Sequence, residues 1–252
     1  MTVYLGTIAL EKNRWEKDQT ATIDVAAYIE RAVKDGFDGV ELWGPHYLLA
    51  DESEKERIRK TGKVSIFNTY VGFDKGITEE LCQNAKAINE INPKAIKFNL
   101  QNKENRDGQV ETLRKFAEML NPEIRLLCEC HLFTLTDDHE IAAGVFNELG
   151  KRYGAMVHTR NGALTEEQDF EDLKCRFKAY GEHICHLHAS NYNGKEFIHI
   201  YDGDVVEKHI DYILSQGYNG NCTIEFTVGD EAEEMYENAL KDLEWLKNKG
   251  IR

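Results

Sequence analysis

Short apolar segments recur along the chain at intervals of about thirty residues, and amphipathic segments separate them. Each apolar segment is rich in β-branched or large apolar side chains, which is typical of parallel strands buried on both faces. We therefore predict eight strands, namely VYLGT (3–7), GVELW (39–43), VSIFN (64–68), AIKFN (95–99), IRLLCE (124–129), AMVH (155–158), ICHLH (184–188) and CTIEF (222–226).

The segments between these strands carry apolar residues at helical spacing. Over 24–35, for example, Val25, Ile29 and Ala32 fall on one face of a helix. A threonine followed by two glutamates at 78–80 is typical of a capped helix start. Helices are also predicted over 165–180, 204–216 and 231–249, and helix ends are marked by Gly36, Gly62, Gly150, Gly181, Gly217, Asn92-Pro93 and Asn121-Pro122.

Strands that alternate with helices indicate a parallel sheet. Eight such units in 252 residues favour one closed (β/α)8 barrel, a TIM barrel, that spans 1–252 as a single domain without a linker or a low-complexity tract. An open sheet that binds a dinucleotide needs a glycine-rich turn after an early strand. The first predicted strand here is followed instead by Ile8-Ala9-Leu10, which removes the main support for that fold.

Composition narrows the class of protein further. Hydrophobic residues make up 41% of the chain, yet no stretch of 18 apolar residues occurs, so no membrane span is expected. Residues 1–10 lack a basic region followed by an apolar core, so we expect no export signal and a cytoplasmic protein. The six cysteines show no framework spacing and are interpreted as reduced thiols, and the Cys128-x-Cys130 pair does not match a structural zinc motif.

The net charge is −14, from 31 basic and 45 acidic residues. A protein that grips a nucleic-acid backbone usually presents a basic surface, so a nucleic-acid partner is not expected. A small phosphorylated substrate is not excluded by this balance.

Four consecutive predicted strands end in ionisable side chains. The strands over 124–129, 155–158, 184–188 and 222–226 bring Glu129, His158, His188 and Glu225 to the rim where barrel enzymes carry their active sites. Buried charges must be paired or bound to metal, so two carboxylates and two imidazoles predict a site for Mn²⁺, Co²⁺, Zn²⁺ or Mg²⁺. His186 also falls on the inward side of its strand, but it lies farther from the strand end and is expected to pack or to support the site.

Other polar or aromatic residues near the same rim are candidates for binding a substrate. They are Glu41, Trp43, Asn68, His131, Arg160 and Asn161. Simpler interpretations exist for several of them: Glu41 is equally consistent with an ion pair inside the barrel, and Trp43 with packing. Lys97 suits either a buried carboxylate or a substrate, and the sequence does not decide between these roles.

Four motifs together resemble the xylose isomerase-like barrel superfamily, and specifically its sugar phosphate isomerase/epimerase branch. They are GFDGVELWG (36–44), LLCECH (126–131), HLHASN (186–191) and DGDVVEKHIDYILSQGYNGNCTIEF (202–226). The resemblance implies a metal held by Glu129, His158, His188 and Glu225, with Glu129 and Glu225 also exchanging the substrate proton and His131 orienting the substrate. The family usually shows Asp-x-x-His where this chain has His158-x-x-Asn161, which favours softer metals such as Zn²⁺ or Co²⁺ over Mg²⁺.

The resemblance implies a metal-dependent isomerase or epimerase that acts on a small sugar, a sugar phosphate or a hydroxy-keto acid through an enediolate. A lyase of the same superfamily, resembling 3-dehydroshikimate dehydratase, is the alternative enzyme, and a metal-free binding barrel is the alternative of another class. Family members are often homodimers or homotetramers. An endonuclease IV-like activity is disfavoured because it needs additional histidines where Trp43 and Asn68 stand.

Overall fold

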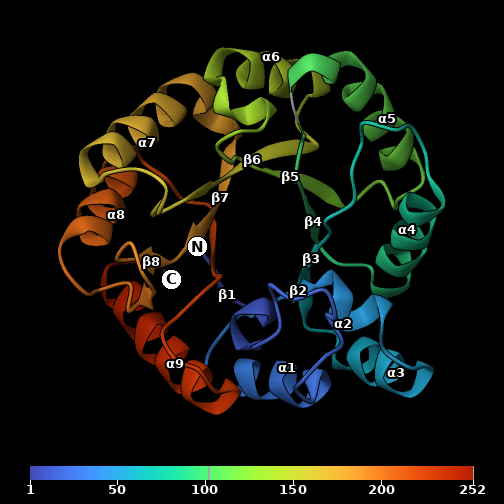
Figure 1. The fold of residues 1–252 in the computed structure, drawn as a ribbon, viewed down its shortest axis with the longest axis horizontal. Coiled ribbons are helices and arrows are strands. Elements are labelled where there is room, and N and C mark those ends of the chain that lie inside the picture. Colours follow the sequence, from blue (N-terminus) through green and yellow to red (C-terminus); the bar gives the residue numbers. More distant parts are fainter. Residues whose placement is uncertain (102, 252) are drawn as a thin grey trace.

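The computed structural model describes residues 1–101 and 103–251. Eight parallel strands close into a barrel in the order β1-β10-β7-β6-β5-β4-β3-β2, which confirms the predicted (β/α)8 fold. Figure 1 looks along the barrel, with the strands in the middle and the helices around them. The barrel strands are β1 (Val3–Gly6), β2 (Gly39–Trp43), β3 (Val64–Asn68), β4 (Ala95–Phe98), β5 (Arg125–Glu129), β6 (Tyr153–His158), β7 (Ile184–Ala189) and β10 (Asn221–Ile224).

Helices follow the strands and form the outer layer (Figure 1). They are α1 (Val25–Lys34), α2 (Gly44–Leu48), α3 (Glu52–Thr61), α4 (Glu79–Ile91), α5 (Arg106–Glu118), α6 (His139–Leu149), α7 (Glu166–Tyr180), α8 (Val205–Ser215) and α9 (Ala232–Asn248). Among the described residues, no helix is both long and apolar enough to cross a membrane.

Side-chain caps explain where several helices begin. Thr165 accepts a hydrogen bond from the amide of Gln168, whose side chain accepts one from the amide of Thr165, so α7 starts with a reciprocal capping box. Thr78 caps α4 through the amide of Leu81, as its sequence predicts. The end of α4 is Asn92, which adopts a left-handed backbone conformation with φ 53° immediately before Pro93.

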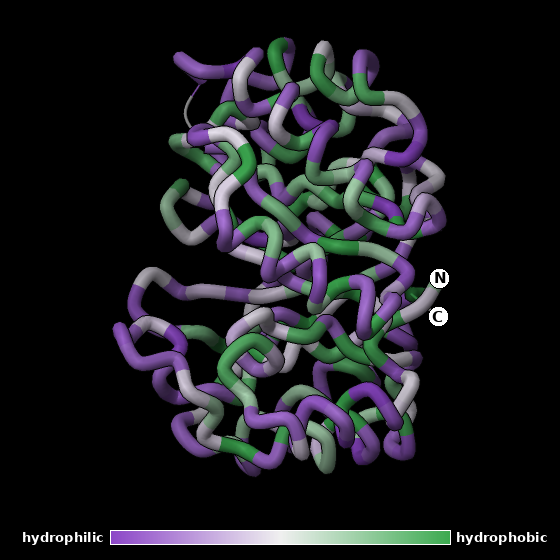
Figure 2. Tube along the Cα trace, turned by 90° about the vertical axis from the view of Figure 1, so that its right-hand side faces the viewer, coloured by the Kyte–Doolittle hydropathy of each residue, from purple (hydrophilic) through white to green (hydrophobic). Residues whose placement is uncertain are grey.

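Apolar side chains fill two spaces, one between the strands and the helices and one inside the barrel. The larger cluster lies between the layers and joins strand residues such as Leu5 and Val40 to helix residues such as Ile29. Inside the barrel, the floor consists of Tyr4, Ile66, Ala95, Leu127 and Met156. Figure 2 shows the hydrophobic positions concentrated along the inner segments and the hydrophilic positions along the periphery. The floor closes the barrel below the polar residues of the rim.

Three segments differ from the predicted elements. The first strand stops at Gly6, and Thr7–Leu10 form a short 3-10 helix, η1, that is fully buried over the barrel. The loop after β7 contains an unpredicted antiparallel hairpin of β8 (Asn191–Tyr192) and β9 (Phe197–Ile198). The last barrel strand ends at Ile224, although the amide of Glu225 still donates to the carbonyl of Ala189 at 3.1 Å. Backbone pairing therefore holds Glu225 at the rim.

Candidate metal and active site

The strand ends bring four ionisable side chains to one point inside the barrel mouth. His158 pairs in register with His188, and His188 pairs with Thr223, two residues before Glu225. Because side chains alternate along a strand, His188 lies one inward layer above His186. One ligand atom from each of Glu129, His158, His188 and Glu225 lies within 4.8 Å of the other three.

The closest contacts of this cluster are not hydrogen bonds. Nδ1 of His188 lies 2.9 Å from Oε1 of Glu129 and 3.2 Å from Oε2 of Glu225. His188 Nδ1 and Glu129 Oε1 are nevertheless both buried without a hydrogen-bond partner. These short distances are ion-pair contacts without hydrogen-bond geometry, and a cation among the four side chains would satisfy the atoms that lack a hydrogen bond. Two imidazoles and two carboxylates suit a divalent cation such as Mn²⁺, Co²⁺ or Zn²⁺.

The electrostatics of the cluster favour a positive charge at its centre. Burial opposes ionisation of Glu129, but Lys97 and His131 outweigh it and hold the pKa of that carboxyl well below its usual value. Burial also disfavours the charged form of His188, yet Glu225 and Glu41 raise the pKa of its imidazole well above the usual value. A proton or a metal ion is the kind of charge that such an environment stabilises.

Glu41 orients the imidazole of His188 from below. Its Oε2 lies 3.0 Å from His188 Nε2, and its Oε1 accepts a hydrogen bond of 3.0 Å from Asn68. With Nε2 occupied in this way, Nδ1 is the nitrogen that faces the cluster. Carboxylates commonly fix metal-binding histidines through this arrangement. His186, one layer lower, bonds instead to Thr223 Oγ1 at 2.8 Å.

The two central carboxylates have different surroundings. Oε2 of Glu129 is 2.5 Å from Lys97 Nζ, 2.8 Å from Asn99 Nδ2 and 3.0 Å from His131 Nε2. Among the described residues, Glu225 has ion pairs only with His158 and His188. Glu129 is therefore fixed by three donors, whereas no described lysine or amide makes a hydrogen bond or ion pair with the side chain of Glu225. The structure assigns the buried Lys97 to Glu129, a choice that the sequence left open.

A cavity of about 330 Å³ opens onto the cluster. Three of the predicted substrate-binding residues, His131, Arg160 and Asn161, line it. Arg160 is held by Asp169 at 2.8 Å, so its guanidinium already has an acidic partner. The other three, namely Glu41, Trp43 and Asn68, are each 1% exposed and lie beneath the cavity rather than along it.

Aromatic side chains supply the part of the cavity wall that the sequence did not reveal. Trp15, Tyr70, Tyr192, Phe197 and Phe226 line it, together with the polar residues of the cluster. They come from the loops after β1, β3 and β10 and from the β8–β9 hairpin. The sequence did not single out any of them as binding residues, although Phe226 directly follows Glu225 in the predicted strand.

No protein-family model matches the chain, and no curated protein matches it. Several solved structures, however, match the chain. A sugar phosphate isomerase/epimerase from Parabacteroides distasonis superposes with a TM-score of 0.62 at 12% identity, over 98% of this chain and 93% of that one. A chitinase domain from Pyrococcus furiosus superposes with a TM-score of 0.56 at 11% identity, over 97% of this chain and 95% of that one. A 2,3-dimethylmalate lyase superposes with a TM-score of 0.56 at 9% identity, over 100% of this chain and 84% of that one. At these identities the likeness establishes the fold, which the chain shares with several classes of enzyme.

Proposed function

We propose that this protein is a metal-dependent isomerase or epimerase of a small carbohydrate or hydroxy-keto acid. The observation that carries the proposal is the convergence of two buried atoms without a hydrogen bond, Glu129 Oε1 and His188 Nδ1, with ligand atoms of His158 and Glu225. The sequence motifs and the structure of the P. distasonis protein support the reaction class. Glu129, His158, His188 and Glu225 would hold the ion.

A divalent ion at this point supplies a Lewis acid that polarises a substrate carbonyl. The protein's own residues perform the proton transfer. We assign the first proton removal to Glu225, because among the described residues its ion pairs are with His158 and His188 alone, whereas Glu129 is held by Lys97 and Asn99 as well. Glu129, which is bonded to Lys97 and to His131, is the second acid/base group. His131 and Asn161 line the cavity where they would orient hydroxyl groups of the substrate.

Isotope exchange tests the reaction. The Mn²⁺- or Co²⁺-loaded protein is incubated in D₂O with a panel of ketoses, aldoses and hydroxy-keto acids, and deuterium at the carbon next to the carbonyl is measured by NMR. We expect exchange with at least one member and none with Glu225→Gln. Absence of uptake across the panel would count against an isomerase, and formation of a dehydrated enone would indicate a lyase instead.

Elemental analysis tests the metal. We expect about one Mn²⁺, Co²⁺ or Zn²⁺ per chain and a loss of that stoichiometry in a His188→Ala variant. A purified protein that contains no metal and has no measurable affinity for these ions would instead be a binding barrel.

A further inference from the structure

The basic side chains that line the site cavity already have acidic partners. The described lining contains Lys97, Arg160, His131 and His158. Lys97 and His131 contact Glu129, and Arg160 contacts Asp169 at 2.8 Å. His158 contacts both central carboxylates. A phosphate dianion in this cavity would find no cation without an acidic partner, and it would face Glu129 and Glu225.

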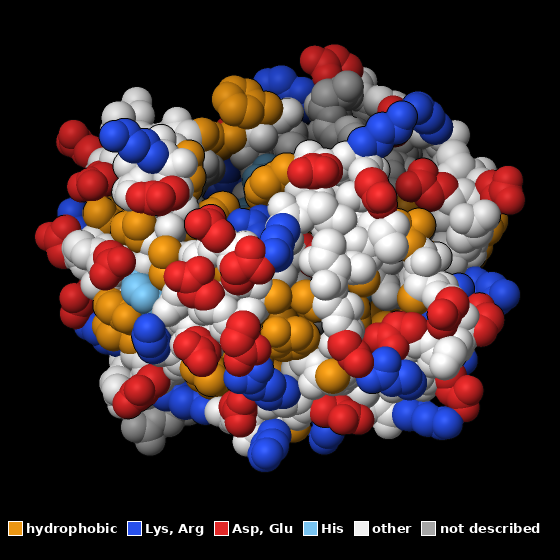
Figure 3. Space-filling model, turned by 60° about the horizontal axis from the view of Figure 1, so that its bottom comes forward, with side chains coloured by type: hydrophobic (Ala, Val, Ile, Leu, Met, Phe, Trp, Pro, Cys, Tyr) orange, Lys and Arg blue, Asp and Glu red, His pale blue; other side chains and the backbone are white. Residues whose placement is uncertain are grey.

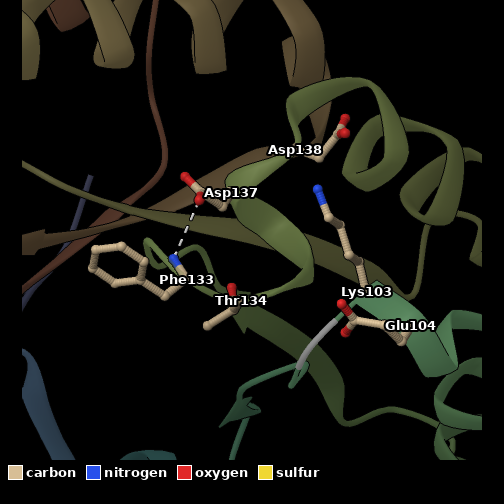
Figure 4. A pocket seen from close by; sticks show the side chains of 6 residues that line it. All are labelled: Lys103, Glu104, Phe133, Thr134, Asp137 and Asp138. Atoms are coloured by element: carbon tan, nitrogen blue, oxygen red, sulfur yellow. Dashed lines mark hydrogen bonds between the residues drawn. The ribbon is translucent and has the colours of Figure 1, made fainter.

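Acidic side chains also line the two neighbouring cavities. Figure 4 shows the cavity between the loops after β4 and β5, where Lys103 stands among three carboxylates. The cavity beside the β8–β9 hairpin offers Arg14 and Lys195, together with Glu196, Asp230 and Glu234. Figure 3 shows acidic and basic side chains intermixed across one outer face rather than a basic patch. In both neighbouring cavities, carboxylates therefore line the same space as the basic side chains.

An aromatic wall forms another side of the site cavity. Phe197 and Phe226 stack with ring centroids 4.5 Å apart, and Trp15 packs on Phe226 at 5.6 Å. Arg14 does not line this cavity, but its guanidinium carbon lies 5.5–6.0 Å from the centroids of the same three rings. These cation–π contacts stabilise the arrangement of the rings. Flat aromatic surfaces beside a few polar groups suit a ligand with one apolar face and a polar edge.

We propose that the substrate is a neutral polyhydroxy compound, an unphosphorylated sugar, whose C–H face packs against Phe226, Phe197 and Trp15. The inference rests on the proposed function and specifies the substrate of that site. The hydroxyl edge of the sugar meets the Glu129, His158 and Glu225 side of the cavity, while the aromatic wall replaces the water on the opposite face of the ring.

Paired substrates test the proposal. Free ketoses and aldoses of five and six carbons are compared with their terminal phosphate esters at equal concentration, using the Mn²⁺-loaded protein. Deuterium exchange and the shift in unfolding temperature are both measured. We expect exchange at least about tenfold faster with a free sugar than with its ester. Faster exchange or a larger temperature shift with the ester would overturn the proposal.

The two measurements separate failure of this inference from failure of the proposed reaction. If no compound exchanges deuterium, a temperature shift produced by free sugars alone still supports the substrate class, while the isomerase proposal fails. If free sugars neither exchange nor shift the unfolding temperature, the substrate class is wrong.

Variants of the wall test its role. Trp15 is 70% exposed, so Trp15→Ala should fold, and we expect its KM for the free sugar to rise about tenfold with a smaller change in kcat. Phe226→Ala should raise KM in the same direction. Phe133→Ala is the matched control, because this aromatic side chain is 87% exposed and lines the neighbouring cavity. An unchanged KM in both wall variants would contradict the packing.

Discussion

At the scale of single residues, His158 decides the chemical character of the proposed metal centre. It stands where the family that the sequence resembles carries an aspartate, and its Nε2 lies 3.3 Å from Glu129 Oε1 and 3.6 Å from Glu225 Oε2. The imidazole therefore meets the geometric requirement of a ligand. Compared with an aspartate, the imidazole gives the set of ligands one negative charge fewer and a softer donor atom. This change would alter which metal the site prefers rather than abolish metal binding.

Restoring the carboxylate tests this interpretation. In His158→Asp we expect affinity for Mg²⁺ and Mn²⁺ to rise relative to Zn²⁺ by about tenfold, because a hard oxygen replaces a nitrogen donor. Competition titrations with a chromophoric chelator measure the ratio. His183→Asp, a histidine that bonds to Asn147 away from the mouth, is the control. The same metal preference in His158→Asp and in the original protein would argue against His158 as a ligand.

Glu41 is a second single-residue determinant, because it occupies His188 Nε2. Glu41→Gln keeps the shape but removes the negative charge below the imidazole. We expect metal affinity to fall about 10–100-fold while the fold is retained, as for other carboxylates that support a metal-binding histidine. Equilibrium dialysis with Zn²⁺ or Co²⁺ measures the loss. Glu90→Gln, which alters a partly exposed hydrogen bond to Tyr47, should leave the affinity unchanged.

At the scale of elements, a buried polar link ties η1 to the start of the helical layer. Glu11 directly follows η1 and lies 2.7 Å from His46 Nε2 in α2, and it accepts a hydrogen bond from Thr22 before α1. Thr7 of η1 bonds to the other nitrogen of His46 at 2.9 Å. These contacts fix the loop after β1, which carries Trp15 to the cavity.

This link makes stability depend on pH in a defined direction. Burial alone would raise the pKa of Glu11, but the bonds from His46 and Thr22 outweigh it and lower that pKa from 4.5. Its contribution to stability is therefore present above that value and is lost as the pH falls through the lowered pKa. We expect Glu11→Gln to cost about 1–3 kcal/mol at pH 7 and progressively less towards pH 3.

Urea unfolding at several pH values measures this difference. Glu16→Gln, at an exposed position of the same loop, is the control. Its unfolding free energy should differ little from that of the original protein at any pH. If the difference in unfolding free energy between Glu11→Gln and the original protein grew as the pH fell, the stabilising role of ionised Glu11 would be contradicted.

At the scale of the whole molecule, the barrel collects side chains that are far apart in sequence into one charged centre above an apolar floor. Glu41 and His188, for example, are 147 residues apart along the chain. Because the proposed ligand positions come together only in the closed barrel, binding of a metal there would be linked to folding.

Metal should therefore stabilise the entire domain. After dialysis against a chelator, addition of Zn²⁺ or Mn²⁺ at about 100 times its Kd should increase the unfolding free energy by about 2.7 kcal/mol. Calorimetry or urea unfolding measures the change. The gain should disappear in Glu225→Gln, and an equal gain in that variant would place the ion elsewhere.

The sequence predicted the barrel well because its evidence is local. Strand segments such as 39–43 and helix starts such as Thr165 depend on neighbouring residues, and the structure has them within a few residues of the predicted bounds. It also placed Glu129, His158, His188 and Glu225 at strand ends, since a parallel barrel brings all carboxyl ends to one rim. The hairpin after β7 carried no comparable local pattern.

The eight-unit barrel and the set of ionisable residues at its mouth could be read from the sequence, because periodicity and strand polarity are properties of the chain. The contacts of each of these residues follow only from the folded molecule. It paired Lys97 with Glu129, placed Glu41 beneath His188, and assembled Trp15, Phe197 and Phe226 from three separate loops into one wall. Such contacts depend on distances between strands and loops, which closure of the barrel sets and no local pattern records.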